Sequence, residues 1–216
     1  MGILKKDIDV YTLIKDDNNL INFCPNRGGI ITNWVLNDNQ ILYFDKKRFL
    51  DKSKSIRGGI PVLFPICGNL EKKSLFGENF LDLMQHGFAR DQEWNYEFNQ
   101  FKNTLCLTLS DNKITRKYYP YFFELKIEIK LSIETLIFKI EIFNKSNTKM
   151  PVNFGLHPYF NISDFNNVKF VDYPKCCLNQ KNNNLAKTEN LFKNLPKGID
   201  LLMYSSGKTS FIDYGL

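Results

Sequence analysis

The chain contains two histidines, His86 and His157, the side-chain type that most readily gains or loses a proton near neutral pH. Each lies among glycine, aromatic and other polar neighbours: the first in residues 84–90, MQHGFAR, and the second in residues 153–160, NFGLHPYF. Imidazole groups act as general acids and bases, and guanidinium groups bind paired oxygens. These two segments therefore predict a polar pocket with an aromatic floor.

A purely structural role is the alternative for each of these residues. A histidine beside aromatic residues is often a hydrogen-bonded core residue, and His86 could tie its loop to backbone carbonyls. Arg57 and Arg90 could form surface ion pairs, which contribute little to stability. Trp94 and Tyr159 could belong to the core or could stack on a ligand.

Composition limits the class of protein and its partners. The 216 residues are 43% hydrophobic and 14% aromatic, which excludes wholesale disorder, and this length suits one large domain or two small ones. The net charge of +6 comes largely from lysines spread along the chain, a pattern typical of solvated strand edges and loops. No nucleic-acid partner is expected, because the basic residues show no groove-reading pattern. A bias toward anionic ligands, including sugar phosphates, is compatible with this charge.

The cysteines and the N-terminal residues favour a cytoplasmic protein. Five cysteines are an odd number, and the adjacent Cys176 and Cys177 lack the spacing of a zinc or redox motif. Reduced thiols and no metal site are expected. Residues 1–7 contain no apolar signal segment, and no hydrophobic run has the length needed to span a membrane.

Hydrophobic periodicity predicts an all-β fold. Apolar residues alternate with charged ones through residues 123–133, and a second alternating run covers 136–142, which together indicate an antiparallel hairpin. Further strands are expected at 8–15, 20–24, 29–36 and 41–45, and a single helical turn at 114–119. Residues 46–90 are expected to be a long site-bearing loop, and residues 179–198 an exposed excursion between strands.

Three motifs in order carry a family resemblance: RGGIP at 57–61, HGFAR at 86–90 followed by Trp94, and LHPYF at 156–160. Together they resemble the aldose 1-epimerase (galactose mutarotase-like) family, near its branch of hexose-6-phosphate 1-epimerases, and together they are far more specific than any one alone. The resemblance implies a large antiparallel β-sandwich, the galactose mutarotase-like supersandwich, whose concave face holds a sugar. It implies a single domain over residues 1–216.

The resemblance also implies roles for individual residues. A mutarotase opens a pyranose ring by protonating the ring oxygen and removing the proton of the C1 hydroxyl. His157 matches the family's acid, and His86 matches the histidine that hydrogen-bonds the sugar near the reacting centre. Arg57 matches the arginine that holds sugar hydroxyls or a 6-phosphate, with Arg90 as a second clamp. Asp200 is a weaker match to an acidic residue that contacts hydroxyls. No cofactor is expected.

The chain departs from the family at the catalytic base. The family's glutamate lies in a Cys-x-Glu-Pro-Trp-like segment that has no match here, and the sequence stops at Leu216 as another strand begins. We therefore expect a β-sandwich that lacks the family's C-terminal strands, and a weak or inactive mutarotase. The alternative is a non-catalytic carbohydrate-binding remnant. The sequence does not choose the hexose or the oligomeric state.

Overall fold

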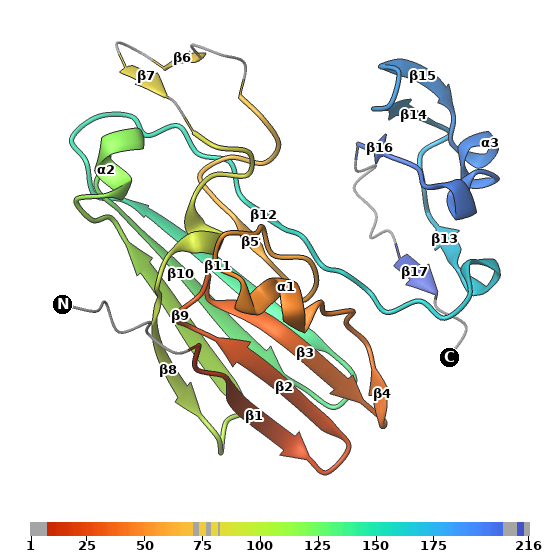
Figure 1. The fold of residues 1–216 in the computed structure, drawn as a ribbon, viewed down its shortest axis with the longest axis horizontal. Helices are drawn as coiled ribbons and strands as arrows, with labels where there is room; N and C mark the ends of the chain where they lie inside the picture. Colours follow the sequence, from red (N-terminus) through yellow and green to blue (C-terminus); the bar gives the residue numbers. More distant parts are fainter. Residues whose placement is uncertain (1–7, 71–73, 77–78, 82, 205–210, 214–216) are drawn as a thin grey trace. The chain divides into compact units, whose positions relative to one another are not determined.

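Two antiparallel sheets of four strands each pack against one hydrophobic core in the computed structural model (Figure 1). The first has the order β1-β2-β3-β4 and comprises Tyr11–Asp16, Asn19–Cys24, Ile30–Leu36 and Asn39–Gln40. The second has the order β11-β10-β9-β8 and comprises Leu136–Asn144, Phe123–Leu131, Thr104–Ser110 and Asn95–Asn99. All pairings within both sheets are antiparallel, which confirms the predicted fold class.

The structure describes residues 8–70, 74–76, 79–81, 83–204 and 211–213. The chain forms two compact units, Met1–Asn161 and Ile162–Leu216, and both sheets belong to the first. The expectation of a single domain over residues 1–216 stays a prediction. Among the described helices, none has the length and apolar character needed to cross a membrane.

The core lies between the two sheets because alternate residues of each strand point inward. In β10 the inward residues are at most 1% exposed: Phe123, Leu125, Ile127, Ile129 and Leu131. Burying a side chain of this size stabilises the fold by about 1.5–3 kcal/mol. A shift of one residue would move this entire face into water, so the hydrophobic pattern fixes the register of β10 against β9 and β11.

Short elements connect the sheets and carry the segments of interest. They are α1 (Lys46–Leu50), β5 (Val62–Leu63), β6 (Ser74–Phe76), β7 (Asn79–Leu81), the 3-10 turn η1 (Ala89–Asp91), α2 (Thr115–Tyr118) and β12 (Gly155–Leu156). The helical turn expected at 114–119 is confirmed as α2. The strand expected at 41–45 is wrong: Leu42 and Phe44 form only isolated bridges, to Phe160 and Gly58.

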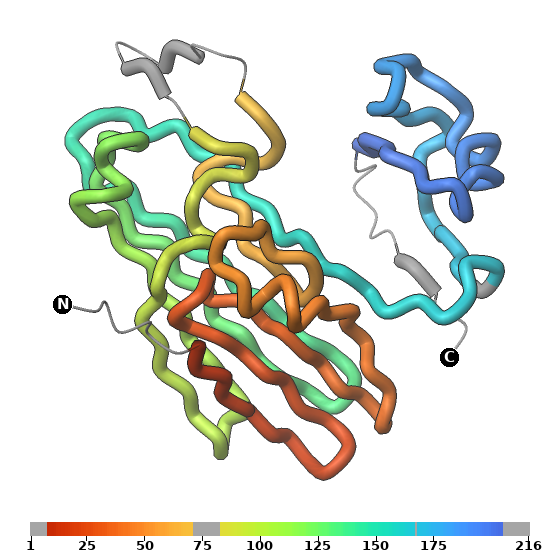
Figure 2. Tube along the Cα trace, in the orientation of Figure 1, coloured from red at the N-terminus to blue at the C-terminus, as the bar shows by residue number. Residues whose placement is uncertain are grey.

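The second unit contains short strands and turns, traced in blue shades in Figure 2. Its elements are η2 (Phe165–Asn167), β13 (Lys169–Val171), β14 (Cys176–Asn179), β15 (Asn184–Lys187), α3 (Thr188–Phe192), η3 (Leu195–Lys197), β16 (Leu201–Leu202) and β17 (Phe211–Asp213). Residues 179–198 connect β14 to β16 and are largely exposed, as expected, but the stretch is not irregular, since it contains a strand, a helix and a turn. Thr188 is fully buried there, and its hydroxyl donates to the carbonyl of Pro174 at 2.6 Å.

Two polar anchors fix the loops that carry the first two motifs. Arg27 is only 6% exposed, and its guanidinium donates to the carbonyls of Asp51 and Lys54, both at 3.1 Å, and to that of Phe49. These bonds hold the chain that leads from α1 to residue 57.

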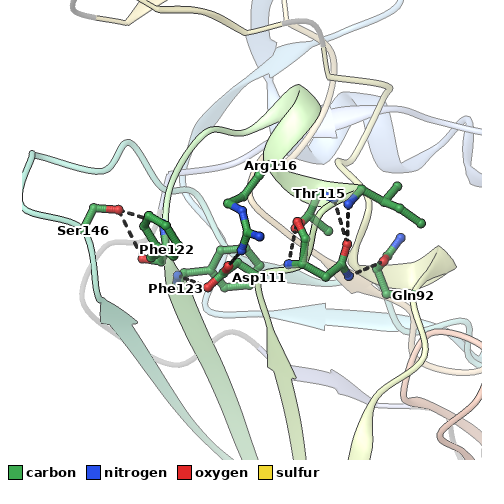
Figure 3. Close-up of polar contacts among 9 residues, drawn as sticks. Gln92, Asp111, Thr115, Arg116, Phe122, Phe123 and Ser146 are labelled. Carbon is green, nitrogen blue, oxygen red and sulfur yellow. Dashed lines mark hydrogen bonds and ion pairs between the residues drawn. The ribbon is translucent and has the colours of Figure 1, made fainter.

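On the other side, the side chain of Gln92 accepts a hydrogen bond of 3.2 Å from Asn112 (Figure 3). Asn112 also accepts from the backbone N–H of Thr115 at 3.0 Å, within α2. This pair of bonds joins the end of η1 to the start of α2, so the loop that follows His86 is held to the connection between β9 and β10.

Candidate functional site

Residues 57–68 form the centre of the candidate site, because the other two motifs lie on either side of them. On one side β5 pairs with β12, and the backbone N–H of His157 donates to the carbonyl of Pro61 at 3.0 Å. On the other side the N–H of Phe88 donates to the carbonyl of Phe64 at 3.0 Å. Three motifs that are distant in sequence are thus neighbours through their backbones.

Two glycines allow this close approach. A Cβ added to Gly59 would lie 2.3 Å from the carbonyl oxygen of Ile31, and one added to Gly87 would lie 2.2 Å from that of Phe64. Their φ angles are +66° and +71°, a region that residues with a side chain rarely adopt. Glycine is required at both positions, whatever the chemistry of the site.

His86 has a constrained backbone and a constrained ring. Its φ angle is 68°, which is uncommon for a residue other than glycine and is often found at functional sites. Its N–H donates to the carbonyl of Gly68 at 2.8 Å, and its ring Nδ1 accepts from the N–H of Gly68 at 2.9 Å. Since Nδ1 is an acceptor, the neutral ring carries its proton on Nε2. The free edge of His86 is therefore a hydrogen-bond donor.

The two histidines lie together. Their ring centroids are 5.9 Å apart, with an angle of 72° between the ring planes. The ring of His157 stacks on that of Tyr159, with centroids 4.8 Å apart, and Arg57 Nη1 lies 3.4 Å from the Tyr159 hydroxyl. His157 is exposed, so its ring is free to meet a ligand while its backbone is held by Pro61.

Positive charge surrounds His86. Burial lowers the pKa of the His86 imidazole from its ordinary value, and the charges of Arg90, His157 and Arg57 lower this pKa further. Both effects disfavour the positive charge that protonation would place on the ring, so the neutral form of His86 is favoured. Arg90 itself donates to the carbonyl of Gln85 at 2.9 Å and lies 3.9 Å from the carboxylate of Asp91.

The structure thus brings together four of the five residues that the sequence analysis selected: His86, His157, Arg57 and Arg90. Their roles stay predictions. Asp200 belongs to the second unit, where it is exposed and accepts a 3.0 Å bond from the side chain of Gln180. Its contact with a sugar also stays a prediction. Within the described part of the chain, no group of His, Cys, Asp or Glu could hold a metal ion.

Of the aromatic residues singled out in the motifs, one lies in the hydrophobic core and another lies at the candidate site. Trp94 is 2% exposed, and its indole N–H donates to the carbonyl of Ala89 at 3.0 Å, so it belongs to the core. Tyr159 lies beside His157. Sequence reasoning missed Gly68, whose backbone N–H sets the tautomer of His86. No side chain signals such a contact, although the sharp Cys67-Gly68 turn directly after the Pro-rich segment is consistent with it.

Comparisons with known proteins bear on the family and the fold of the chain. The sequence profile described as aldose 1-epimerase matches residues 9–214. A crystal structure of the Slr1438 protein from Synechocystis sp. PCC 6803 is 35% identical, with a TM-score of 0.79 over 88% of this chain and 68% of that chain. A galactose mutarotase-like protein from Lactobacillus casei is 20% identical, with a TM-score of 0.65 over 79% of this chain and 59% of its own, and shares the fold.

Among curated proteins, one from Cenchrus ciliaris carries the provisional name glucose-6-phosphate 1-epimerase and is 29% identical over 158 residues. This match covers 66% of the present chain and 44% of the relative, so the chain spans less than half of that relative's length. The match to a protein of the same name from Salmonella typhimurium is similar, at 28% identity with 66% and 46% covered. Since the profile covers nearly all of the sequence, the chain belongs to the aldose 1-epimerase family.

Proposed function

We propose that the site built from His86, His157, Arg57 and Arg90 interconverts the α and β anomers of a hexose or a hexose 6-phosphate. The observation that carries this proposal is the 5.9 Å separation of the two imidazole rings. Groups this close can act on a single pyranose ring, and holding them in place removes part of the entropic cost of reaction. Membership of the aldose 1-epimerase family supports the reaction type.

In the proposed reaction His157 is the general acid. It gives its proton to the ring oxygen as the bond between that oxygen and C1 breaks, and the C1 hydroxyl loses its proton to form the open-chain aldehyde. Rotation about C1–C2 presents the other face of the carbonyl. The ring oxygen then attacks that face, and the two protons return. His86, which is neutral with Nε2–H exposed to the site, donates a hydrogen bond that orients the sugar. The C1 hydroxyl gives its proton to solvent water in this scheme, because the segment that carries the family's glutamate base has no match in these 216 residues.

The preferred substrate class in this proposal is a hexose 6-phosphate. The two guanidinium groups, Arg57 and Arg90, both act on the pKa of His86, and each presents a fork of donors suited to phosphate oxygens. The net charge of +6 favours an anionic ligand over a neutral one. Asp200 is proposed to contact a sugar hydroxyl, as the family resemblance implies.

A second function, carbohydrate binding without catalysis, is favoured by two observations. The charges that act on His86 are cationic, and the segment that supplies the family's glutamate base has no match in these 216 residues. Such a site holds a sugar phosphate but has no carboxylate base to take the proton of the C1 hydroxyl. The two functions share the same residues and differ in turnover alone.

Calorimetry and exchange NMR with glucose and glucose 6-phosphate test these proposals together. We expect tighter binding of the phosphate, and a loss of about 10–100-fold in Arg90→Gln, the range given by one charge-assisted hydrogen bond. Lys130→Gln on β10, which removes the same charge from an exposed position, serves as the control.

Equal affinity for the two sugars would remove the phosphate preference. Binding with exchange no faster than in buffer would leave the binding function alone, and failure to bind either sugar would end both proposals.

A further inference from the structure

Strand β11 forms one edge of the second sheet and carries an unusual outer face (Figure 1). Within the part of the chain that the structure describes, β10 is the strand that pairs with it. The residues on its outer face are Ile137, Lys139, Glu141 and Phe143. The two apolar ones, Ile137 and Phe143, are 51% and 44% exposed. An edge strand with large exposed apolar side chains is a template for pairing with another strand.

The backbone of β11 is in the correct phase for such pairing. In the hairpin that joins β10 to β11, the N–H of Ser132 donates to the carbonyl of Thr135 at 2.9 Å, so these residues form a hydrogen-bonded pair. Hydrogen-bonded and non-hydrogen-bonded pairs alternate along an antiparallel ladder. The N–H and C=O groups of Phe138, Ile140 and Ile142 therefore point away from β10, toward the edge.

The sequence of β11 is self-complementary about Ile140. If a second β11 lies antiparallel with its Ile140 opposite this one, Lys139 faces Glu141 of the other copy, and Ile137 faces Phe143. On the inner face Phe138 meets Ile142. Opposite charges and apolar pairs both stabilise neighbouring strands. The two outer-face pairs, Lys139 with Glu141 and Ile137 with Phe143, would occupy non-hydrogen-bonded positions, where side chains are closest.

We propose that β11 pairs with β11 of a second copy of this chain, around a two-fold axis at Ile140, to join the two second sheets into one. Such a contact is isologous, because each copy supplies the same surface, and it therefore closes as a dimer. Half-buried residues of the inner face, Leu136, Phe138, Ile140 and Ile142, pack against the core and gain cover from their counterparts. This proposal does not depend on the proposed catalytic function.

Within one copy, Lys139 Nζ and Glu141 Oε1 lie 3.3 Å apart, and their side chains are 64% and 36% exposed, respectively. They sit on the solvent face, so exchanging their charges leaves the core unchanged. In the proposed dimer, residue 139 of each copy faces residue 141 of the other, so there are two such pairs. Lys139→Glu alone turns both into pairs of glutamates, and Glu141→Lys alone turns both into pairs of lysines. The double variant restores opposite charges.

The test is sedimentation equilibrium of the 216-residue chain and these three variants, with circular dichroism to verify folding. The wild-type chain and the double variant are expected to be dimers. Each single variant is expected to show at least about a tenfold rise in the dimer dissociation constant, since like charges replace opposite charges at two positions. An equimolar mixture of the two single variants is expected to recover the dimer, because one copy then presents only glutamate and the other only lysine.

Lys130→Glu, on the neighbouring strand β10, changes the same charge away from the edge and is expected to leave the dimer intact. A wild-type chain that is monomeric at about 100 µM, or that forms open-ended aggregates, overturns the proposal. A dimer that is indifferent to the single variants, or a mixture that fails to recover it, overturns it as well.

Discussion

Replacing His157 with asparagine is expected to lower the catalysed rate of anomer exchange by up to about 10²–10⁴-fold, the usual contribution of a general acid, with the loss limited by the weak activity expected without the family's glutamate. The side chain is exposed and its backbone N–H bond to Pro61 is retained in the variant, so the fold should be unaffected. Asparagine keeps a hydrogen-bond donor but has no proton to give at neutral pH. Exchange NMR between the anomers of glucose 6-phosphate measures the rate directly.

Tyr159→Phe is the matched control for this experiment. It removes the hydroxyl that lies 3.4 Å from Arg57 while leaving a ring on which His157 can stack. Less than about a tenfold loss is expected, since a single weak polar contact is removed. If His157→Asn exchanges anomers at the wild-type rate, His157 is not the acid, and the proposed mechanism is wrong.

Replacing Gly87 with alanine is expected to cause the largest loss of stability. The new Cβ would lie 2.2 Å from the carbonyl oxygen of Phe64 and 2.7 Å from the backbone nitrogen of Pro65, and neither backbone can rotate away as a side chain could. The φ angle of +71° adds a cost of about 1–2 kcal/mol for a residue with a Cβ. We expect a total loss of more than about 3 kcal/mol, or failure to fold.

Gly68→Ala separates the two causes. Gly68 has a similar φ angle of +88°, but a Cβ there has no neighbour within 4 Å, so only the conformational cost of about 1–2 kcal/mol applies. Urea unfolding followed by tryptophan fluorescence compares the variants, and it reports on the first unit because Trp34 and Trp94 both lie in it. Equal losses in the two variants would show that the packing of Gly87 against Phe64 is not as close as described.

The sheets could be predicted where the hydrophobic pattern alone sets the structure. Alternation of Phe123, Leu125 and Ile127 with charged residues identified β10 because one face of this strand is buried and the other is wet. The pattern failed at residues 41–45, where the N–H of Tyr43 donates to the carbonyl of Tyr159, far along the chain, and that of Asp45 to the carbonyl of Arg57. A local hydrophobic pattern cannot predict hydrogen bonds to residues that are distant in the sequence.

The candidate site shows the same division. His86, His157 and the two arginines could be selected because their side chains are scarce or chemically distinct and occur in motifs. Their proximity could not be derived from spacing, since it depends on residues 57–68 pairing with one motif on each side. The contact from Gly68 to His86 was also beyond prediction, because a backbone N–H leaves no trace in the sequence.

The claim that both histidines belong to one sugar site is tested most directly by their ring signals in proton–nitrogen NMR spectra. The chain has only two histidines, so without an added tag every imidazole signal belongs to His86 or His157. On titration with glucose 6-phosphate, both sets of signals are expected to shift with the same dissociation constant, and His86 should keep its proton on Nε2. A ligand that shifts one histidine and leaves the other unchanged, or shifts neither at saturation, would contradict the account.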